Sequence, residues 1–508
     1  MISLWHKHAP LACFAVAVLA ALAFLAVRVP VPRVHDEFSY LLAADTYASG
    51  RLTNPAHPHW QHFESFHTIH QPSYASKYQP GQGGALAVGQ ALFGHPIHGS
   101  VLASGCAAAA VCWMLAAWLP PRWALCGGLL IALHPLILAN WTLSYWGGAL
   151  PMAAGALVFG ASKRIADRPH ITDAALLGIG ATLLAATRPF EGLVLCLCVG
   201  VALLAAFWKS QEKQRLLLRG CVPTIGTVAA GLAMLAAYNH AVTGSAARMP
   251  YQVHEQTYGV SPLFLWQDAK PEPDYRHREL RRYYTGWGIE DFDRQRDLVG
   301  WADTKRQSMA GLLRFFAGGA MFLPVAAAVF TLRDPRTHLA WLALAASLAA
   351  ALCVPWTYPH YLAPAAPLLL LLAVAGLRRG SVALRRSHPV AKHAVAAVLA
   401  LQLVTLAGQL VLYARWQPEG WEFDRARILD NLEATGERHL VFVRYAPNHN
   451  VHAEWVYNRA DIDAAPVVWA REMSPGQNAA LIEHDAGRRV WLLKPDVEPR
   501  VLLPYPTH

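Results

Sequence analysis

Charged residues are scarce in this sequence of 508 residues. Asp, Glu, Lys and Arg make up 15% of the chain and hydrophobic residues 55%, whereas soluble domains average about 25% charged residues. A chain with so little charge is not an ordinary soluble protein. The composition predicts a polytopic α-helical membrane protein.

Cysteine is absent from the polar regions. The eight cysteines lie inside or at the edges of apolar segments, at Cys13, Cys106, Cys112, Cys126, Cys196, Cys198, Cys221 and Cys353. This distribution gives no disulfide framework and no zinc motif. A small-x-small cleavage site is also missing after the first apolar stretch, so we expect a retained helix rather than a signal peptide.

Long apolar segments dominate what is present. At about twenty residues per bilayer crossing, the sequence predicts about eleven spans, at 10–29, 97–119, 123–140, 146–162, 172–188, 191–208, 220–238, 311–331, 338–356, 361–377 and 393–413. Lys and Arg gather in alternate short connections, including 163–168, 209–219, 333–336 and 378–392. The positive-inside bias then predicts a cytoplasmic N-terminus and a periplasmic C-terminus.

Three polar regions are therefore expected on the outer face, at 30–96, 239–310 and 414–508. We predict a membrane domain over 1–413 and a small α/β domain over 414–508, with short strands at 440–443 and 490–493 and a helix at 478–484. The apolar stretch 83–93 is too short to span and fits an interfacial or re-entrant helix. The net charge of +10 does not indicate nucleic acid, because no soluble module carries a basic face interleaved with aromatics.

Chemistry-bearing residues concentrate in the first outer region. The run His35-Asp36-Glu37-Phe38-Ser39-Tyr40 follows the first apolar segment, and Lys77-Tyr78-Gln79-Pro80 closes the region. Between them lie several imidazoles, at His57, His59, His62, His67 and His70. Acids, imidazoles and a lysine on one face of a bilayer are typical of a membrane enzyme rather than of an anchor.

The order of these motifs resembles the GT-C superfamily of membrane glycosyltransferases. The match rests on the Asp36-Glu37 pair, the Tyr78-x-Pro80 ending, Thr187-Arg188-Pro189, and the late His360-Tyr361-Leu362-Ala363-Pro364. This superfamily includes protein mannosyltransferases, the lipid A aminoarabinose transferase and RgtA/B/C/D-like envelope transferases, which the chain resembles most. It departs from many members before the fourth helix, where residues 144–148 hold no second acidic residue.

The resemblance implies transfer of a sugar from a polyprenyl-phosphate carrier to a glycan, lipid or protein acceptor. It implies the periplasmic face of a bacterial inner membrane and inversion at the anomeric carbon. The resemblance does not firmly imply any cofactor and assigns no metal site. It is compatible with a divalent cation. Asp36 would be the general base with Glu37 beside it, and its pKa is expected to be raised by the neighbouring acid and the low-dielectric boundary. The alternative for Asp36 is a cap on a helix over 37–48.

Cations and donors should face the departing lipid phosphate. The candidates are Lys77, Tyr78, Arg188, His360 and Tyr361. Arg188 could instead snorkel to the headgroups or pair with Glu191, and His360 could belong to an interfacial aromatic belt.

Two polar segments have less specific interpretations. His62, Glu64 and His67 are candidates for the acceptor cavity, or for a metal site if the loop folds back, and they could simply pack with neighbouring aromatics. The aromatic and arginine residues of 258–287 fit either an acceptor-binding lid or an amphipathic surface helix.

A transporter or flippase of a lipid-linked envelope intermediate is the alternative function. Transporters keep ionisable residues near the bilayer midplane in related halves, and this sequence places them at the outer ends of helices without an internal repeat. A scaffold or sensor acting through 414–508 is a third class, which would tolerate the loss of Asp36.

Overall fold

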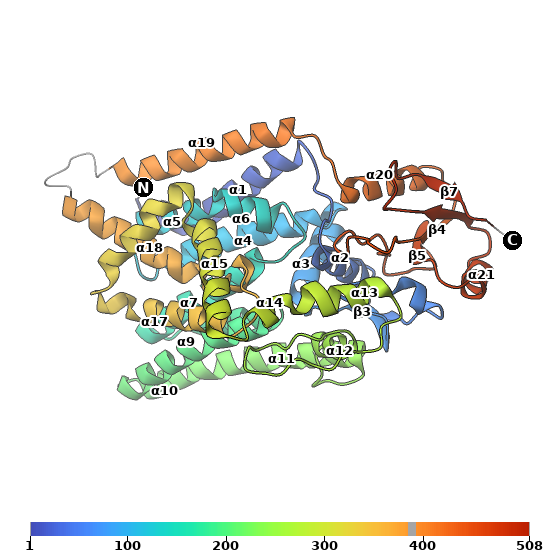
Figure 1. The fold of residues 1–508 in the computed structure, drawn as a ribbon. Helices are drawn as coiled ribbons and strands as arrows, with labels where there is room; N and C mark the ends of the chain where they lie inside the picture. Colours follow the sequence, from blue (N-terminus) through green and yellow to red (C-terminus); the bar gives the residue numbers. More distant parts are fainter. Residues whose placement is uncertain (1, 385–392, 507–508) are drawn as a thin grey trace.

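The computed structural model describes residues 2–384 and 393–506. A bundle of long helices forms one end of the molecule and a small α/β unit forms the other (Figure 1). Part of the expected cytoplasmic loop 378–392, with Arg385, Arg386 and Lys392, lies outside the described residues.

Apolar, alanine-rich segments form the bundle. Its longer helices are α1 (Ile2–Leu25), α4 (Ile97–Leu115), α5 (Pro121–Ala132), α7 (Ala149–Asp167), α8 (Ile171–Ala185), α9 (Pro189–Lys209), α11 (Val222–Thr243), α15 (Leu298–Ala317), α17 (His338–Leu352), α18 (Ala366–Leu384) and α19 (Ala394–Arg415). The shorter ones are α6 (Pro135–Ile137), α10 (Lys213–Leu216) and α16 (Phe322–Ala327), with single turns at Leu138–Thr142, Leu217–Cys221, Gly319–Met321, Ala328–Thr331 and Pro335–Thr337.

Fewer helices reach membrane length than the hydropathy of the sequence predicts. Within the described residues, six are long and apolar enough to cross a bilayer, or eight if each of two bent pairs makes one span. The apolar stretches 123–140 and 311–331 break into pieces bent by 43° and 92°, at His134-Pro135 and Gly318-Gly319, where proline and glycine interrupt the helix. Helices α8 and α17 have only 15 residues each.

The first outer region holds α2 (His35–Ala48), α3 (Pro80–Phe93) and a small antiparallel sheet. Its strands, β1 (Asn54–Pro55), β2 (Thr68–Ile69) and β3 (Ser73–Ser76), have the order β1-β3-β2, and a turn covers Trp60–Phe63. The short apolar stretch 83–93 is part of α3, which packs closely on α4. A Cβ on Gly99 would lie 2.1 Å from the Ala85 carbonyl oxygen, so the helices can approach this closely only with glycine there.

The second outer region is built from short helices. These are α12 (Pro250–Thr257), α13 (Arg278–Arg282), the turn Tyr283–Trp287 and α14 (Gly288–Arg294). A buried aromatic cluster joins this region to the first, with Phe66 packed among Tyr258, Tyr283 and Tyr284.

The C-terminal unit contains α20 (Trp421–Glu433), β4 (His439–Val443), β5 (Val467–Arg471), α21 (Pro475–His484), β6 (Arg489–Leu493) and β7 (Leu502–Pro504). The sheet order is β5-β4-β6-β7, with β4 parallel to β5 and β6, and β7 antiparallel to β6. One face of this sheet shares a hydrophobic core with the first outer region, where Leu42, Phe63 and Tyr74 pack with Leu440 and Phe442. The unit is therefore fastened to the region that carries Asp36.

Candidate functional site

Asp36 lies in the first turn of α2 and faces the end of the first outer region. The helix begins at His35, two residues earlier than the capping alternative requires, and Asp36 makes no capping hydrogen bond. Its carboxylate contacts His67 Nδ1 at 2.5 Å and accepts a hydrogen bond from the Tyr78 hydroxyl. The side chain is 21% exposed, so a small part of it remains accessible to a substrate.

The expected pKa shift of Asp36 has the wrong sign. Burial alone would raise the pKa, but His67, Lys77 and the Tyr78 hydrogen bond outweigh burial and hold the pKa of Asp36 below its ordinary value. The sequence argument considered only the adjacent acid and the membrane boundary. The chain instead brings in three stabilising groups from 31 to 42 residues away, so Asp36 is a carboxylate at neutral pH.

Glu37 points into a different environment from Asp36. Its two oxygens accept hydrogen bonds from the backbone N–H groups of Arg33 (2.8 Å), Val34 (3.3 Å) and Tyr145 (3.0 Å). Successive residues of a helix point about 100° apart, which separates the two carboxylates. Glu37 thus ties the start of α2 to the loop before α7 and makes none of the contacts of Asp36.

His67 is held in an unusual backbone conformation beside Asp36. Its φ of 59° is rare for a residue other than glycine. The Ser39 hydroxyl (2.6 Å) and the Lys77 N–H (3.1 Å) both donate to its carbonyl oxygen and fix this conformation. Burial and the nearby Lys77 lower the pKa of His67. A neutral ring can therefore donate from Nδ1 to Asp36 and accept at Nε2 from the Tyr283 hydroxyl, 3.3 Å away.

Lys77 is buried and already paired with an acid. Its ammonium lies 3.8 Å from Glu255 on α12, and Lys270 reaches the same carboxylate at 3.7 Å. Burial lowers the pKa of Lys77, and Glu255 counteracts this effect. The pairing makes Lys77 a part of the electrostatic frame around Asp36 and less available to an incoming phosphate than the sequence alone indicates.

Arg188 is a cation of the site with no ion pair to Glu191 or any other acid in the described part of the chain. It stands just before α9, with its guanidinium carbon 4.7 Å from the centre of the Tyr361 ring. A cavity of about 240 Å³ is lined by Arg188, Tyr40, Gln79 and Gln82. The Tyr40 ring stacks on Tyr78 at 4.5 Å, so the Arg188 cavity is connected to the partners of Asp36 through two tyrosines.

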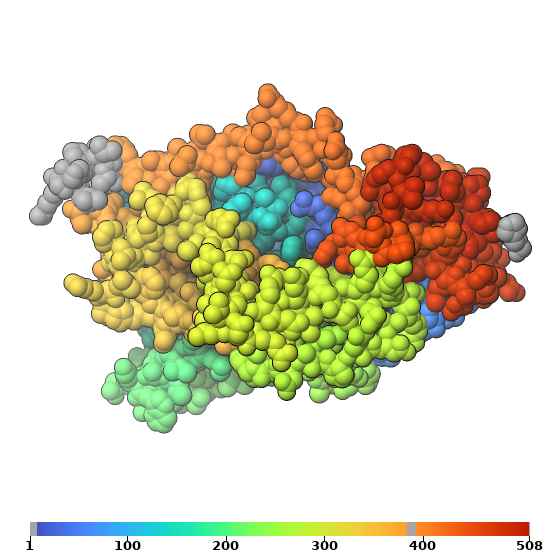
Figure 2. Space-filling view, viewed as in Figure 1, coloured from blue at the N-terminus to red at the C-terminus, as the bar shows by residue number. Residues whose placement is uncertain are grey.

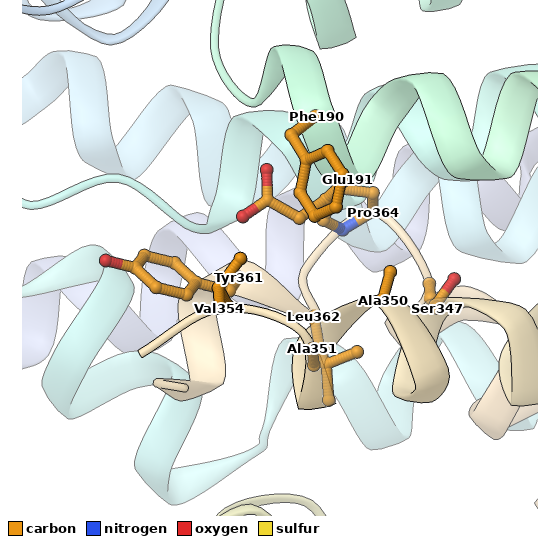
Figure 3. Close-up of a pocket in the computed structure, with 10 residues that line it drawn as sticks. Phe190, Glu191, Ser347, Ala350, Ala351, Val354, Tyr361, Leu362 and Pro364 are labelled. Atoms are coloured by element: carbon orange, nitrogen blue, oxygen red, sulfur yellow. The ribbon is translucent and has the colours of Figure 1, made fainter. Parts of the chain in front are cut away.

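The late motif forms a turn at Pro359–Tyr361 beside this cavity. His360 is buried, and its ring lies 4.8 Å from Trp146 and stacks on Tyr358 at 5.8 Å. Burial lowers the pKa of His360 well below its usual value, so it is a neutral donor or acceptor. A mostly apolar cavity of about 340 Å³ adjoins it, with Glu191 and Tyr361 at one end and α17 at the other (Figure 3).

His62 and Glu64 do not join His67 in one cluster. His62 Nδ1 contacts the Arg471 carbonyl oxygen at 2.9 Å, and Glu64 accepts a hydrogen bond from Tyr258 at 2.8 Å. Each is engaged at the junction with another outer region, whereas His67 faces Asp36. The loop does not fold back as the metal-site alternative requires.

One other group of residues has the donor atoms for a metal ion. In the described residues, His57, Asp463 and His484 place their ligand atoms within 4.8 Å of one another. The backbone N–H of His59 donates to His57 Nδ1 at 2.9 Å, which leaves the proton of a neutral ring on Nε2, directed at Asp463. A metal on Nε2 requires the opposite tautomer, so the group fits a hydrogen-bonded contact between the first outer region and the C-terminal unit better than a metal site. Around Asp36 the contacting groups are His67 and Tyr78 with Lys77 close by, and this set also does not fit a metal.

Sequence reasoning missed the contributions of the other two outer regions. Tyr283 contacts His67, Glu255 pairs with Lys77, and Tyr457 of the C-terminal unit lies 2.7 Å from His35 Nδ1. Their positions in long polar segments give no periodic signal. Only the aromatic content of 258–287 indicated that this segment could serve the site.

The architecture has clear counterparts among solved structures. ArnT from Cupriavidus metallidurans, bound to undecaprenyl phosphate, matches with a TM-score of 0.54 and 13% identity over 94% of this chain and 92% of that one. An oligosaccharyltransferase from Archaeoglobus fulgidus, in complex with zinc and sulfate, matches with a TM-score of 0.51 and 13% identity over 94% of this chain and 67% of that one.

The chain has the GT-C fold. No protein-family model matches its sequence, and no curated protein matches it. The GT-C fold together with the apolar helices makes the chain a multi-pass membrane protein. The expected fold class is confirmed at this level, although the number of spans is not.

Proposed function

We propose that this protein is a membrane glycosyltransferase that moves a sugar from a polyprenyl-phosphate carrier to an envelope acceptor. The observation that carries the proposal is an ionised, partly exposed Asp36 linked through Tyr78 and Tyr40 to Arg188. A base and a phosphate-binding cation are the two groups that this displacement needs. The likeness to a transferase bound to undecaprenyl phosphate supports the choice of donor.

In the proposed reaction, an acceptor hydroxyl oxygen attacks the anomeric carbon of the donor sugar. The hydroxyl proton passes to Asp36 Oδ, while the bond from the anomeric carbon to the phosphate oxygen breaks. The electron pair of that bond stays on the leaving lipid phosphate, where Arg188 and neutral His360 stabilise the charge. One displacement inverts the anomeric carbon.

The apolar cavity beside Tyr361 suits the first isoprene units of the carrier. Phe190, Leu362 and the alanines of α17 line it, and Glu191 and Tyr361 mark its polar end (Figure 3). We assign the site to the periplasmic face of an inner membrane, with the N-terminus in the cytoplasm and the regions 30–96, 239–310 and 414–508 outside. Within this frame, residues 1–413 form the catalytic membrane domain and 414–508 its periplasmic companion.

Mass spectrometry of envelope lipids and glycans tests the proposal. A null strain is compared with the same strain carrying the wild-type gene, and a glycosyl mass increment should appear only with the gene. The size of the increment would identify the sugar class. The flippase alternative predicts a different result. It would be favoured if no glycosyl increment depended on the gene and a lipid-linked intermediate accumulated on the inner leaflet of the null strain.

Arg188→Met is expected to lower the transfer rate roughly 100-fold, the scale of losing one donor to a developing anion. Arg219→Met is the matched control, because Arg219 is exposed at the opposite end of the bundle. The measurement is the initial rate in membranes with equal amounts of each protein. Equal rates for the two variants would remove Arg188 from the phosphate site.

The pH dependence should report the pair of Asp36 and His67. The pKa of Asp36 is depressed in the folded protein. The carboxylate therefore persists even at pH values below the ordinary pKa of Asp, and it is lost only as pH falls through the lower, folded-state pKa. His67→Phe removes a stabilising partner and leaves burial to raise the pKa. The acid limb of kcat/KM, which in the wild type should lie below the ordinary pKa of Asp, should therefore move to higher pH in this variant. An unmoved limb would show that His67 does not set the ionisation of Asp36.

A further inference from the structure

A group of aromatic rings extends from Asp36 to the protein surface. Tyr283, which contacts His67, packs on Trp287 with ring centres 5.1 Å apart, and Trp287 meets His452 edge-on at 5.1 Å. His452 in turn stacks with His35 at 6.0 Å and 19°. Trp287 is 40% exposed and His452 is exposed, whereas His35 is buried. The three segments that supply these rings come from all three outer regions.

The surface of the molecule is hollowed near its middle. Figure 2 shows a hollow bounded by α15, α19 and the C-terminal unit, with blue and teal segments from the first third of the chain at its floor. Trp287 reaches Asp36 through Tyr283 and His67, and its exposed ring surface would gain free energy on being covered, because burial of apolar surface is favourable.

One buried polar atom in this wall has no partner. His35 Nδ1 is held by the Tyr457 hydroxyl at 2.7 Å, but His35 Nε2 forms no hydrogen bond in the described structure, although the side chain is only 5% exposed. A buried nitrogen without a hydrogen-bond partner is unfavourable. A ligand hydroxyl could satisfy it in either tautomer, because a hydroxyl both donates and accepts.

The nearby arginines use their guanidinium N–H groups on backbone carbonyl oxygens. Arg278 donates to the Ala446 carbonyl oxygen at 3.1 Å, and Arg282 donates to those of Pro447 at 2.9 Å and His449 at 3.0 Å. They hold the segment that carries His452 in place. The wall itself consists of aromatic rings, and burial lowers the pKa of His452, so its rings match the flat apolar face and hydroxyl rim of a sugar ring.

We propose that His35, Trp287 and His452 form the acceptor subsite and that the acceptor is a glycan ending in a neutral sugar. This inference rests on the proposed transferase function and names its acceptor class. A ring stacked on Trp287 would direct one hydroxyl to His35 Nε2 and another toward Asp36, which removes its proton.

Saturation-transfer NMR on the full-length protein in nanodiscs tests the subsite without requiring transfer. The probe is the lipid-free oligosaccharide released by mild acid from envelopes of the null strain. The wild type and Asp36→Asn should both saturate sugar-ring protons, since Asp36→Asn keeps the wall. Trp287→Ala, His452→Ala and His35→Phe should each bind roughly tenfold more weakly, whereas Trp266→Ala should bind normally. Trp266 is 69% exposed in the same outer region, stacked on Phe264 away from this wall.

The outcomes separate this inference from the function itself. Wild-type binding of the oligosaccharide in Trp287→Ala and His452→Ala, or no saturation of sugar protons in the wild type, would overturn the subsite while the transferase could stand. Preferential saturation of an anionic lipid headgroup or a peptide in the same experiment would also overturn it. Loss of the glycosyl mass increment is the separate test of the function, and it does not depend on these variants.

Discussion

Asp36→Asn should lower the transfer rate by roughly 10²- to 10⁴-fold, the range that a positioned general base contributes. The amide keeps the shape of the side chain and an oxygen that can accept from His67 or Tyr78, so the fold should survive. It cannot take up the proton of the acceptor hydroxyl. The measurement is the initial rate per folded protein, with the donor saturating, so that the loss appears in kcat rather than in KM.

Glu37→Gln is the matched control for this prediction, because the chain places two acids side by side in different roles. Glu37 accepts three backbone hydrogen bonds, and an amide nitrogen in place of one oxygen leaves donors unmet, at a cost of about 1–3 kcal/mol in stability. The rate per folded molecule should stay near that of the wild type. If the two variants lose kcat equally, the assignment of the base to Asp36 alone is wrong.

Arg471→Met should destabilise the packing of the three outer regions by about 3–5 kcal/mol, the cost of breaking a buried ion pair from one side. Arg471 is 2% exposed at the end of β5. It pairs with Glu454, lies 3.5 Å from Glu279, and donates to the Glu64 carbonyl oxygen at 2.7 Å. Methionine fills much of the volume but leaves the buried carboxylate of Glu454 without its cation, whereas Glu279 keeps Arg278 at 3.2 Å.

Limited proteolysis of the outer regions and thermal unfolding followed by tryptophan fluorescence would measure this effect. Arg489→Met is the control, because Arg489 also pairs with an acid, Glu437, but both side chains are more than half exposed. An exposed pair contributes about 0–1 kcal/mol. Equal stability of the two variants would contradict the role of Arg471.

The position of Asp36 could be predicted from sequence, because it depends only on the segments that directly precede and follow it in the chain. The acid follows an apolar helix and precedes an amphipathic one, and both features are visible in the residues. The different direction of Glu37 was also within reach, since adjacent helical residues point about 100° apart.

The sign of the Asp36 pKa shift was not predictable in the same way. It depends on His67 and Lys77, which a strained turn and a three-stranded sheet bring to the carboxylate. The contacts of Arg471 were even harder to predict from sequence. Its partners come from three regions, and Glu64 lies 407 residues away along the chain. The number of spans is not confirmed, because the bends at Pro135 and Gly319 shorten the straight helices in two of the apolar segments.

The contact between His35 and Tyr457 joins residues 422 positions apart, and this separation governs when activity can begin during biosynthesis. The proposed base leaves the ribosome among the first fifty residues, but the last part of its surroundings follows about 20 to 80 s later at elongation rates of about 5–20 residues per second. A nascent chain already inserted in the bilayer would carry Asp36 without the complete wall that we propose for the acceptor. The enzyme would therefore stay silent until translation is nearly complete, and a prematurely terminated chain could not transfer sugar.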